Sequence, residues 1–339
     1  MKILFIGGTG TISSACAQLA VHRGFELALL NRGRQPAAAG ARQIIADISD
    51  PDATAAALGR ETWDVVVDFI AYTSAELGQR LELFRGRTGQ FIFISSASVY
   101  QKPPAHFPLT ESTPLVNPYW DYSRQKIACE ERLLRSLQED QFPATIIRPS
   151  WTYNEQRITV PVNSKKNFTI VDRMRRGLPV IVPGDGTALW TMTHNTDFAK
   201  GLVGLLGHQG AIGHAFHITS DEVLTWNQIY EAVAHAAGVS QPRLVHIPSD
   251  FISACLPEFA GGLLGDKAHS SVFDNAKIKR FVPDYVATTR FRDGMIRSVN
   301  WFDADPARRE IDAAANTFWD RLITGYQAGL QKTLSEMGR

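Results

Sequence analysis

The stretch KILFIGGTGTIS, residues 2–13, decides the fold of this chain. Its apolar first half predicts a buried strand, and the residues from 11 to 23 predict a helix. A glycine turn between a strand and a helix lets the backbone approach a pyrophosphate, which the N–H groups and partial positive charge of the helix N-terminus then hold. The stretch therefore predicts a dinucleotide-binding turn, although Ser13 stands where a third glycine is usual.

A second segment, YSRQK at residues 122–126, predicts the chemistry. Tyr122 and Lys126 are four residues apart, so on a helix they share one face. A cation beside a phenol lowers the pKa of the phenol and makes it a usable base. An exposed lysine could not lower it far enough, whereas a partly buried lysine together with an oxidised nicotinamide ring could. A dinucleotide site with an activated tyrosine implies hydride transfer to or from an alcohol or ketone.

Short apolar runs alternate with helical ones and predict right-handed βαβ units in a parallel sheet. We expect an α/β fold, a Rossmann-type doubly wound sheet with a smaller, interleaved C-terminal substrate domain. The larger domain is expected to hold residues 1–155 and 193–220, and the smaller one residues 156–192 and 221–339. Strands are expected at residues 26–31, 43–46, 65–69, 90–95 and 144–148.

Further motifs follow along the chain, and their order adds to the argument. GGTGTIS is followed by SSASVY at residues 95–100, YSRQK, and RPSWTY at 148–153, and then by GDG at 184–186 and HNTD at 194–197. Together these stretches resemble the extended short-chain dehydrogenase/reductases, the NAD-dependent epimerase/dehydratase-like family of sugar epimerases, dehydratases and ketoreductases. The tripeptide NRG at residues 31–33 is similar to a sub-branch related to the chloroplast stem-loop RNA-binding proteins.

The resemblance implies three catalytic residues. Tyr122 would be the general acid/base, and Lys126 would lower its pKa and hold the nicotinamide ribose. Ser96 would hydrogen-bond the substrate oxygen. The alternative for Ser96 is that this serine and its neighbours only cap the end of a strand.

The cofactor is expected to be NADP or NAD, with a slight preference for NADP. A carboxylate after the second strand would select NAD, but Asn31 at that place is uncharged. Arg32 and Arg34 follow, and a guanidinium group suits a 2′-phosphate; the alternative is a solvated loop. The residues expected to bind the dinucleotide are Gly7, Gly10, Thr11, Ile12, Asn31, Arg32, Asp47, Ile48, Ile70, Ala71, Tyr122, Lys126 and Pro149.

The substrate is expected to be a small, sugar-like molecule. Ala97 and Ser98 stand where the dehydratases of the family have an acid pair, which argues against water elimination. Trp190 and Trp151 replace the diphosphate-binding residues of the nucleotide-sugar enzymes. They could stack on a sugar, or they could be core residues; two lysines at 165–166 keep a phosphorylated substrate open. The expected substrate-binding residues are Ser98, Trp151, Tyr153 and Trp190.

Composition limits the partners. The 35 basic and 34 acidic residues balance, which argues against a nucleic-acid surface. The three cysteines fit neither a metal site nor a disulfide framework, and the histidines form no convincing ligand set. The HNTD stretch is expected to cap a helix. No apolar stretch is long enough to span a membrane, and no signal peptide precedes the first strand. We therefore expect a cytoplasmic protein without a bound metal.

Several functions stay open at this point. The expected one is an NAD(P)-dependent reductase, dehydrogenase or epimerase acting on a sugar-like or polyol carbon. The alternatives are a nucleotide-sugar epimerase with a non-standard substrate clamp, a non-catalytic dinucleotide- or RNA-binding relative, and a redox-sensing regulator. In the family that the motifs resemble, the helices after the fourth and fifth strands often pair across a two-fold axis, so the resemblance implies a homodimer through the helices near 74–85 and 119–137. On the second helix, apolar positions exceed those needed for one core face: Ala128, Leu133, Leu134 and Leu137.

Overall fold

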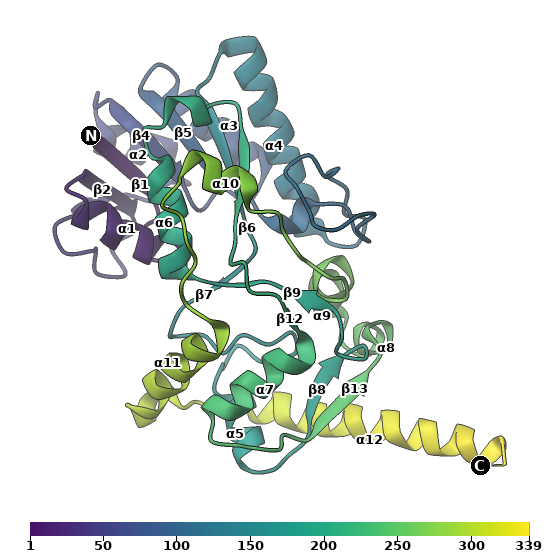
Figure 1. Ribbon diagram of the computed structural model, residues 1–339. Coiled ribbons are helices and arrows are strands. Elements are labelled where there is room, and N and C mark those ends of the chain that lie inside the picture. Colours follow the sequence, from purple (N-terminus) through teal and green to yellow (C-terminus); the bar gives the residue numbers. More distant parts are fainter. Residues whose placement is uncertain (339) are drawn as a thin grey trace. The chain divides into compact units, whose positions relative to one another are not determined.

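The computed structural model describes residues 1–338, and the chain forms two compact units (Figure 1). The first unit comprises Met1–Tyr153, Thr191–Asp221 and Val272–Thr288. The second comprises Asn154–Trp190, Glu222–Ser271 and the chain from Thr289 onward. The sequence placed residues 272–288 in the smaller domain, whereas the structure returns them to the first unit.

A seven-stranded parallel sheet organises the first unit. Its strand order is β11-β6-β5-β4-β1-β2-β3, which confirms the predicted Rossmann-type α/β fold. The five strands predicted after the first appear within two residues of their expected bounds, because buried parallel strands are continuous apolar runs. The strands are β1 Lys2–Ile6, β2 Glu26–Asn31, β3 Arg42–Ile45, β4 Trp63–Asp68, β5 Thr88–Ile94, β6 Ala144–Pro149 and β11 Ala215–Ile218.

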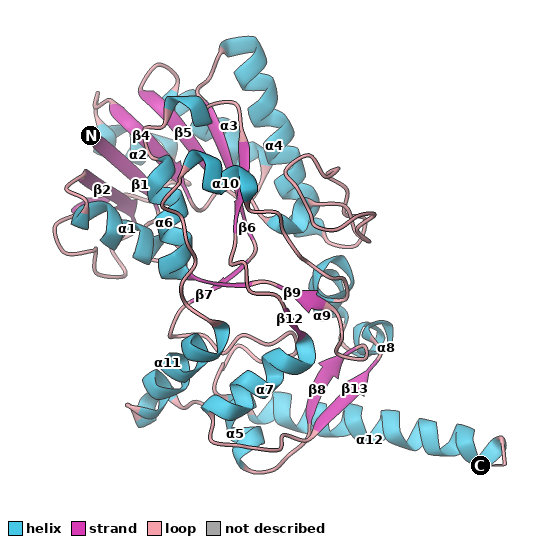
Figure 2. Ribbon diagram, in the orientation of Figure 1, coloured by secondary structure: helices cyan, strands magenta, loops and turns pink. Residues whose placement is uncertain are grey.

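Helices cover both faces of this sheet (Figure 2). On one face, side chains such as Cys16, Phe198 and Ile278 pack against the strands; on the other, Leu81 and Cys129 do so. The first face carries α1 Ser13–His22, α6 Asn195–Leu205 and α10 Ala276–Phe281, and the second carries α2 Pro51–Leu58, α3 Ser74–Phe84 and α4 Asp121–Asp140.

Short elements complete the first unit. The turn η1 Ala97–Val99 follows β5, and η2 Gln209–Ala211 follows α6. Strand β7 Trp151–Tyr153 pairs in parallel with β10 Met192–His194. The His194 side chain accepts a hydrogen bond from the Thr196 N–H at the start of α6, which confirms the predicted helix cap.

The second unit is built from helices around two small sheets. Strand β8 pairs in parallel with β13, and β9 pairs with β12 in antiparallel fashion. Ile181, Ile247 and Trp319 lie in its apolar core. Its elements are α5 Thr169–Arg175, β8 Val180–Pro183, β9 Leu189–Trp190, β12 Leu224–Thr225, α7 Trp226–Ala236, β13 Leu244–Ile247, α8 Ser249–Cys255, α9 Pro257–Gly262, η3 Leu263–Lys267, α11 Phe291–Asp303, η4 Pro306–Arg308 and α12 Ala313–Glu336.

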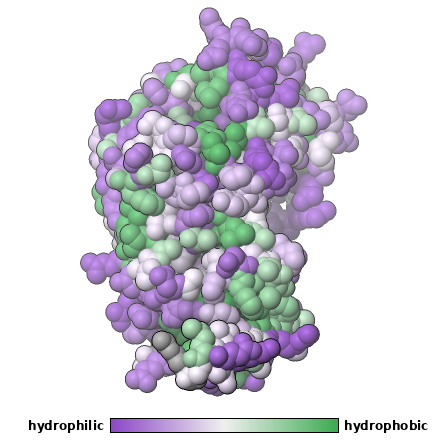
Figure 3. All heavy atoms as spheres, turned by 90° about the vertical axis from the view of Figure 1, so that its right-hand side faces the viewer, coloured by the Kyte–Doolittle hydropathy of each residue, from purple (hydrophilic) through white to green (hydrophobic). Residues whose placement is uncertain are grey.

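The outer surface of α4 bears on the expected homodimer. Leu133 is buried in the core of the first unit, whereas Leu134 is 41 % exposed. The upper part of the surface in Figure 3 is mostly hydrophilic, with a hydrophobic strip down its middle. The homodimer stays a prediction.

Within residues 1–338, no helix combines the length and the apolar character needed to cross a membrane.

Candidate active site

The glycine turn after β1 adopts a backbone that only glycine tolerates easily. Gly7 and Gly8 have φ values of +103° and +98°. A Cβ atom on Gly8 would come within 2.7 Å of the Leu29 side chain. Ser13, at the place of the usual third glycine, is buried, and its Oγ accepts a hydrogen bond of 2.9 Å from the Gly10 N–H. The departure from the glycine pattern therefore closes the turn with a side-chain hydrogen bond.

The first turn of α1 is available to an anion. Ile12, at the N-cap position, makes no side-chain cap hydrogen bond. On the other side of the loop, Asn195 Nδ2 donates to the Thr11 carbonyl at 2.9 Å and braces it from the start of α6. N–H groups at an uncapped helix start are the usual partners of a phosphate. The geometry thus supports the predicted pyrophosphate position.

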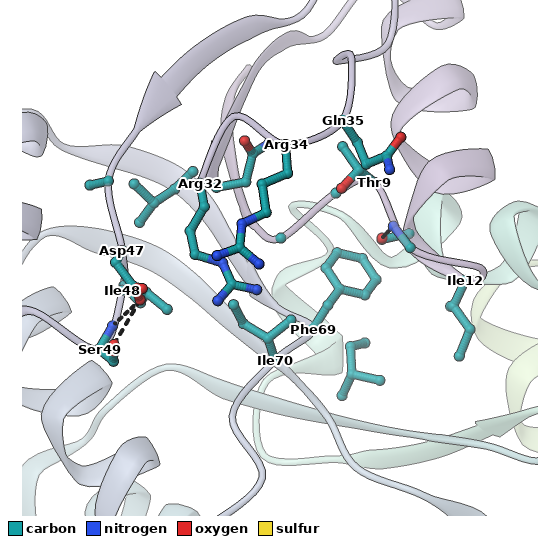
Figure 4. A pocket seen from close by; sticks show the side chains of 18 of the residues that line it. Thr9, Ile12, Arg32, Arg34, Gln35, Asp47, Ile48, Ser49, Phe69 and Ile70 are labelled. Carbon is teal, nitrogen blue, oxygen red and sulfur yellow. Dashed lines mark hydrogen bonds between the residues drawn. The ribbon is translucent and has the colours of Figure 1, made fainter. Parts of the chain in front are cut away.

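A pocket of about 770 Å³ opens at the carboxyl ends of the strands (Figure 4). Nine predicted cofactor residues line it: Gly7, Gly10, Thr11, Ile12, Asn31, Arg32, Asp47, Ile48 and Ile70. Gln35, Tyr72 and Glu76 also line the pocket and were not among the predicted residues. Gln35 and Tyr72 lie four residues beyond the ends of β2 and β4, and Glu76 lies in the first turn of α3, so only their closeness in sequence to a strand end or a helix start could have indicated them. Pro149 is buried at the end of β6.

The part of the pocket next to the end of β2 is rich in hydrogen-bond donors. The Oδ1 atom of Asn31 accepts from the Gly33 N–H at 2.8 Å and from Gln43 Nε2 at 2.9 Å. Its Nδ2 is buried and has no hydrogen-bond partner within the described chain. The guanidinium groups of Arg32 and Arg34 lie side by side in the pocket (Figure 4). This corner can therefore hold a group that brings acceptor oxygens and negative charge.

Asp47 faces the same corner. Its carboxylate accepts hydrogen bonds from the N–H and hydroxyl of Ser49, at 3.0 and 2.7 Å. These bonds hold the pKa of Asp47 below its usual value, and the nearby charges of Arg32 and Arg34 lower it further. Asp47 therefore forms a turn, the alternative that its sequence context allowed, and lines the pocket as well.

Lys126 and Tyr122 lie together on α4, as the spacing predicts. Lys126 is 1 % exposed, and its Nζ donates to the carbonyl oxygens of Ala71 and Ile94 at 2.7 and 2.8 Å. The same nitrogen lies 6.0 Å from the centre of the Tyr122 ring. Burial lowers the pKa of Lys126 to about 8, and the Asp68 carboxylate acts in the opposite direction. Ala71, predicted to contact the cofactor, thus holds the lysine through its carbonyl group.

Asp68 is a site residue that the sequence analysis did not single out. It is fully buried at the end of β4, and its Oδ1 accepts from the N–H groups of Ile70 and Ala71 at 2.8 and 3.0 Å. Burial raises the pKa of this carboxyl, and the charges of Arg80 and Lys126 oppose that change. Asp68 fixes the turn that presents the Ala71 carbonyl to Lys126. An acidic residue closing an apolar strand was its only signal.

Three serine hydroxyls lie in series next to this pair. Ser96 Oγ lies 2.9 Å from Ser98 Oγ and accepts from the Ser98 N–H at 3.2 Å. Ser98 Oγ also accepts a hydrogen bond of 2.8 Å from Ser123, the residue after Tyr122. Ser96 does cap η1, as the alternative for it proposed, and the residue is also partly exposed. Ser123 was not among the predicted site residues.

The aromatic residues predicted to bind substrate lie in different surroundings. Tyr153 is buried, with its ring perpendicular to that of His194 at 5.2 Å. Trp151 is partly exposed at the start of β7. Trp190 belongs to the second unit, where it is buried and stacks on Trp226 at 4.8 Å. That packing agrees with the core role that the sequence analysis left open for Trp190.

The fold and the site define a class. A doubly wound sheet, a glycine turn and a Tyr–Lys pair on the helix after β5 are the features of the extended short-chain dehydrogenase/reductases that the motifs resembled. The pattern of the NAD dependent epimerase/dehydratase family matches residues 3–219. The chain therefore belongs to this family of nicotinamide-dependent oxidoreductases and epimerases, which confirms the resemblance.

Two sequence relatives and one solved structure illustrate the range of similar proteins. The 2′-dehydrokanamycin reductase of Streptomyces kanamyceticus is 25% identical over 290 residues, which cover 84% of this chain and 80% of the relative. The chloroplast stem-loop binding protein of 41 kDa b from Arabidopsis thaliana is 30% identical over 267 residues, 74% of this chain and 67% of the relative. The UDP-glucose 4-epimerase of Thermus thermophilus, in complex with NAD, shares the fold with a TM-score of 0.69 and 20% identity, over 89% of this chain and 99% of that one.

Proposed function

We propose that this protein is an NADP-dependent reductase of a ketone on a sugar-like substrate. The observation that carries the proposal is the buried Lys126 beside Tyr122, with the Ser96 hydroxyl at the neighbouring strand end. The similarity to a 2′-dehydrokanamycin reductase supports the direction of the reaction and the type of substrate.

The chain's own residues account for the proton chemistry. A bound NADPH would supply the hydride. Tyr122 donates a proton to the oxygen of the substrate, and Lys126, whose cation is held by two backbone carbonyls, stabilises the phenolate that results. Ser96 donates a hydrogen bond to the same oxygen and orients it.

The preference for NADP rests on the donors around Asn31. A 2′-phosphate would bring acceptor oxygens to Asn31 Nδ2 and negative charge to Arg32 and Arg34. Calorimetry should therefore give a lower Kd for NADP than for NAD. Arg32→Ala should weaken NADP by about tenfold and leave NAD unchanged, since a guanidinium–phosphate contact is worth about 1.5 kcal/mol or more. Arg23→Ala, at the exposed end of α1, is the matched control.

The reaction is tested by adding NADPH and a panel of methyl glycosides, each oxidised to a ketone at a single ring hydroxyl. Loss of the near-ultraviolet absorbance of NADPH, with formation of the alcohol, is the expected result. An epimerase would instead interconvert unoxidised sugars without net consumption of the cofactor. Failure to reduce any member of the panel would remove the reductase proposal.

A further inference from the structure

The hydroxyl of Ser123 belongs to a chain of hydrogen bonds that ends on the proposed catalytic serine. Ser123 Oγ lies 2.8 Å from Ser98 Oγ, which lies 2.9 Å from Ser96 Oγ. Ser123 and Ser98 are 0 % and 3 % exposed, so water does not compete for their protons. All three serines belong to the first unit, and Ser123 follows Tyr122 directly on α4.

The number of hydroxyl hydrogens determines which serine donates and which accepts at each step of this series of hydrogen bonds. Each serine hydroxyl has one hydrogen to donate. Ser123 donates its hydrogen to Ser98, so the hydrogen of Ser98 must go to another acceptor. Within residues 1–338 the remaining hydroxyl in contact with Ser98 Oγ is that of Ser96. The opposite direction would leave a buried hydroxyl hydrogen on Ser98 without a partner, which costs free energy.

The same count determines what Ser96 can do. Its Oγ accepts from the hydroxyl and from the N–H of Ser98, so both lone pairs are engaged. Its own hydrogen has no acceptor within the described chain, and the residue is partly exposed. We propose that Ser123 and Ser98 are positioning residues that make Ser96 a hydrogen-bond donor, which suits a ketone oxygen. The proposal rests on the proposed reduction of a ketone.

The Asn117 side chain also helps to fix the three serines in place. The Asn117 side chain donates from Nδ2 to the Ser98 carbonyl at 2.8 Å, and its Oδ1 accepts from the N–H groups of Tyr119 and Trp120 at 3.2 Å. Asn117 therefore ties η1 to the start of α4, which carries Ser123 and Tyr122. The two groups proposed to donate to the substrate oxygen are thus connected by side-chain hydrogen bonds.

Neutron diffraction from deuterated crystals tests the direction without any substrate. We expect the deuterium of Ser98 between Ser98 Oγ and Ser96 Oγ, and the deuterium of Ser96 pointing away from Ser98. A deuterium of Ser96 placed on the line to Ser98 would overturn the proposal. Because this measurement needs no turnover, it tests the direction of the chain even if no ketone in the panel is reduced, an outcome that would count against the proposed function alone.

Two variants and a control test the consequence for catalysis. Ser123→Ala lets Ser98 accept from Ser96, so kcat/KM for the reduced ketone should fall about tenfold while the Kd of NADP stays unchanged. Adding Ser98→Ala removes that competing acceptor, so the double variant should be more active than Ser123→Ala alone. Ser136→Ala, a buried serine of α4 whose Oγ has no partner in the described chain, should match the wild type.

The double variant separates positioning from packing. If Ser123 and Ser98 only filled space, two truncations would harm the enzyme more than one. A double variant that is less active than Ser123→Ala would therefore overturn the proposal, as would wild-type activity of Ser123→Ala.

Discussion

The Nζ atom of Lys126 lies 6.0 Å from the centre of the Tyr122 ring while it donates to the carbonyl oxygens of Ala71 and Ile94. The cation is therefore placed by the turn after β4 and by the end of β5, not by the tyrosine. The Tyr122 hydroxyl can be removed without moving the lysine, so the roles of the two residues can be separated.

Tyr122→Phe should lower kcat by about 10²- to 10⁴-fold, the usual range for losing a general acid, and should leave the Kd of NADP unchanged. The ring and its contacts with Trp120 and Tyr72 remain, and only the hydroxyl is lost. Steady-state kinetics on the reduced ketone and calorimetry check both quantities. Tyr119→Phe, an exposed neighbour, should behave as the wild type. Turnover by Tyr122→Phe near the wild-type rate would make Tyr122 a structural residue.

Lys126→Met should reduce both turnover and cofactor affinity, because this lysine is also expected to hold the nicotinamide ribose. Combined with Tyr122→Phe, it should cost little more than the worse single change, since residues that act as a unit are not additive. The kinetics of the two single variants and of the double variant, compared with the wild type, form a double-mutant cycle. Losses that multiply would show that the two side chains act independently.

Gly10→Asp should abolish dinucleotide binding, because a carboxylate would stand at the helix start that the pyrophosphate needs. A Cβ atom on Gly10 would lie 3.5 Å from Ser13 Oγ, an ordinary contact, so the fold should survive as judged by circular dichroism. Gly10→Ala supplies the matched control, with the same Cβ and no charge. Retained binding by Gly10→Asp in calorimetry would contradict the proposed pyrophosphate position.

The buried Lys126 predicts a pH dependence of stability. Its pKa of about 8 lies below the ordinary 10.5. Between these pH values the unfolded chain binds a proton at Lys126 that the folded chain does not, so the free energy of unfolding rises with pH. Below about pH 8, Lys126 is protonated in both the folded and the unfolded chain, so this residue no longer makes the free energy of unfolding change with pH. Relative to Lys126→Met, the wild type should gain about 3 kcal/mol across this window, measured by urea unfolding. A constant difference would contradict the burial of a charged amine.

Arg148, the arginine of the RPSWTY motif, should act through stability. Its guanidinium group is buried and bonds the Glu130 carboxylate with contacts of 2.6 to 3.2 Å. Arg148→Met leaves an unpaired buried carboxylate and should cost about 3–5 kcal/mol in urea unfolding, much of which Glu130→Leu should restore. The exposed Arg85–Asp140 pair is the control, and Arg85→Met should cost much less than Arg148→Met, because water screens an exposed ion pair. A small loss for Arg148→Met would show that water reaches the pair.

The sequence predicted the parallel sheet because each strand is a short apolar run between helical ones, and buried parallel strands have that composition. It also predicted the spacing of Tyr122 and Lys126, because a helix sets that spacing locally. The return of Val272–Thr288 to the first unit was not predictable in this way. The segment contains one short helix, α10, and its contribution is a few side chains such as Ile278 in the core.

Contacts between distant residues account for the other differences. Asp68 and Ala71 hold Lys126 across more than fifty residues of chain, and Ser123 meets Ser98 only because α4 packs beside η1. No periodicity in the sequence reports such a pair. Trp190 was expected at a ligand because of its place in a motif, while its packing on Trp226 depends on a helix that begins later in the chain.

The order of the sheet has a consequence for biosynthesis. Strand β6 has only one neighbour until β11, which lies beyond a stretch of the second unit, has been translated. Until then, one edge of β6 is unpaired in the nascent chain, and an unpaired strand edge can pair with other chains. A ribosome-bound chain stopped before β11 should depend on chaperones more than one stopped after it.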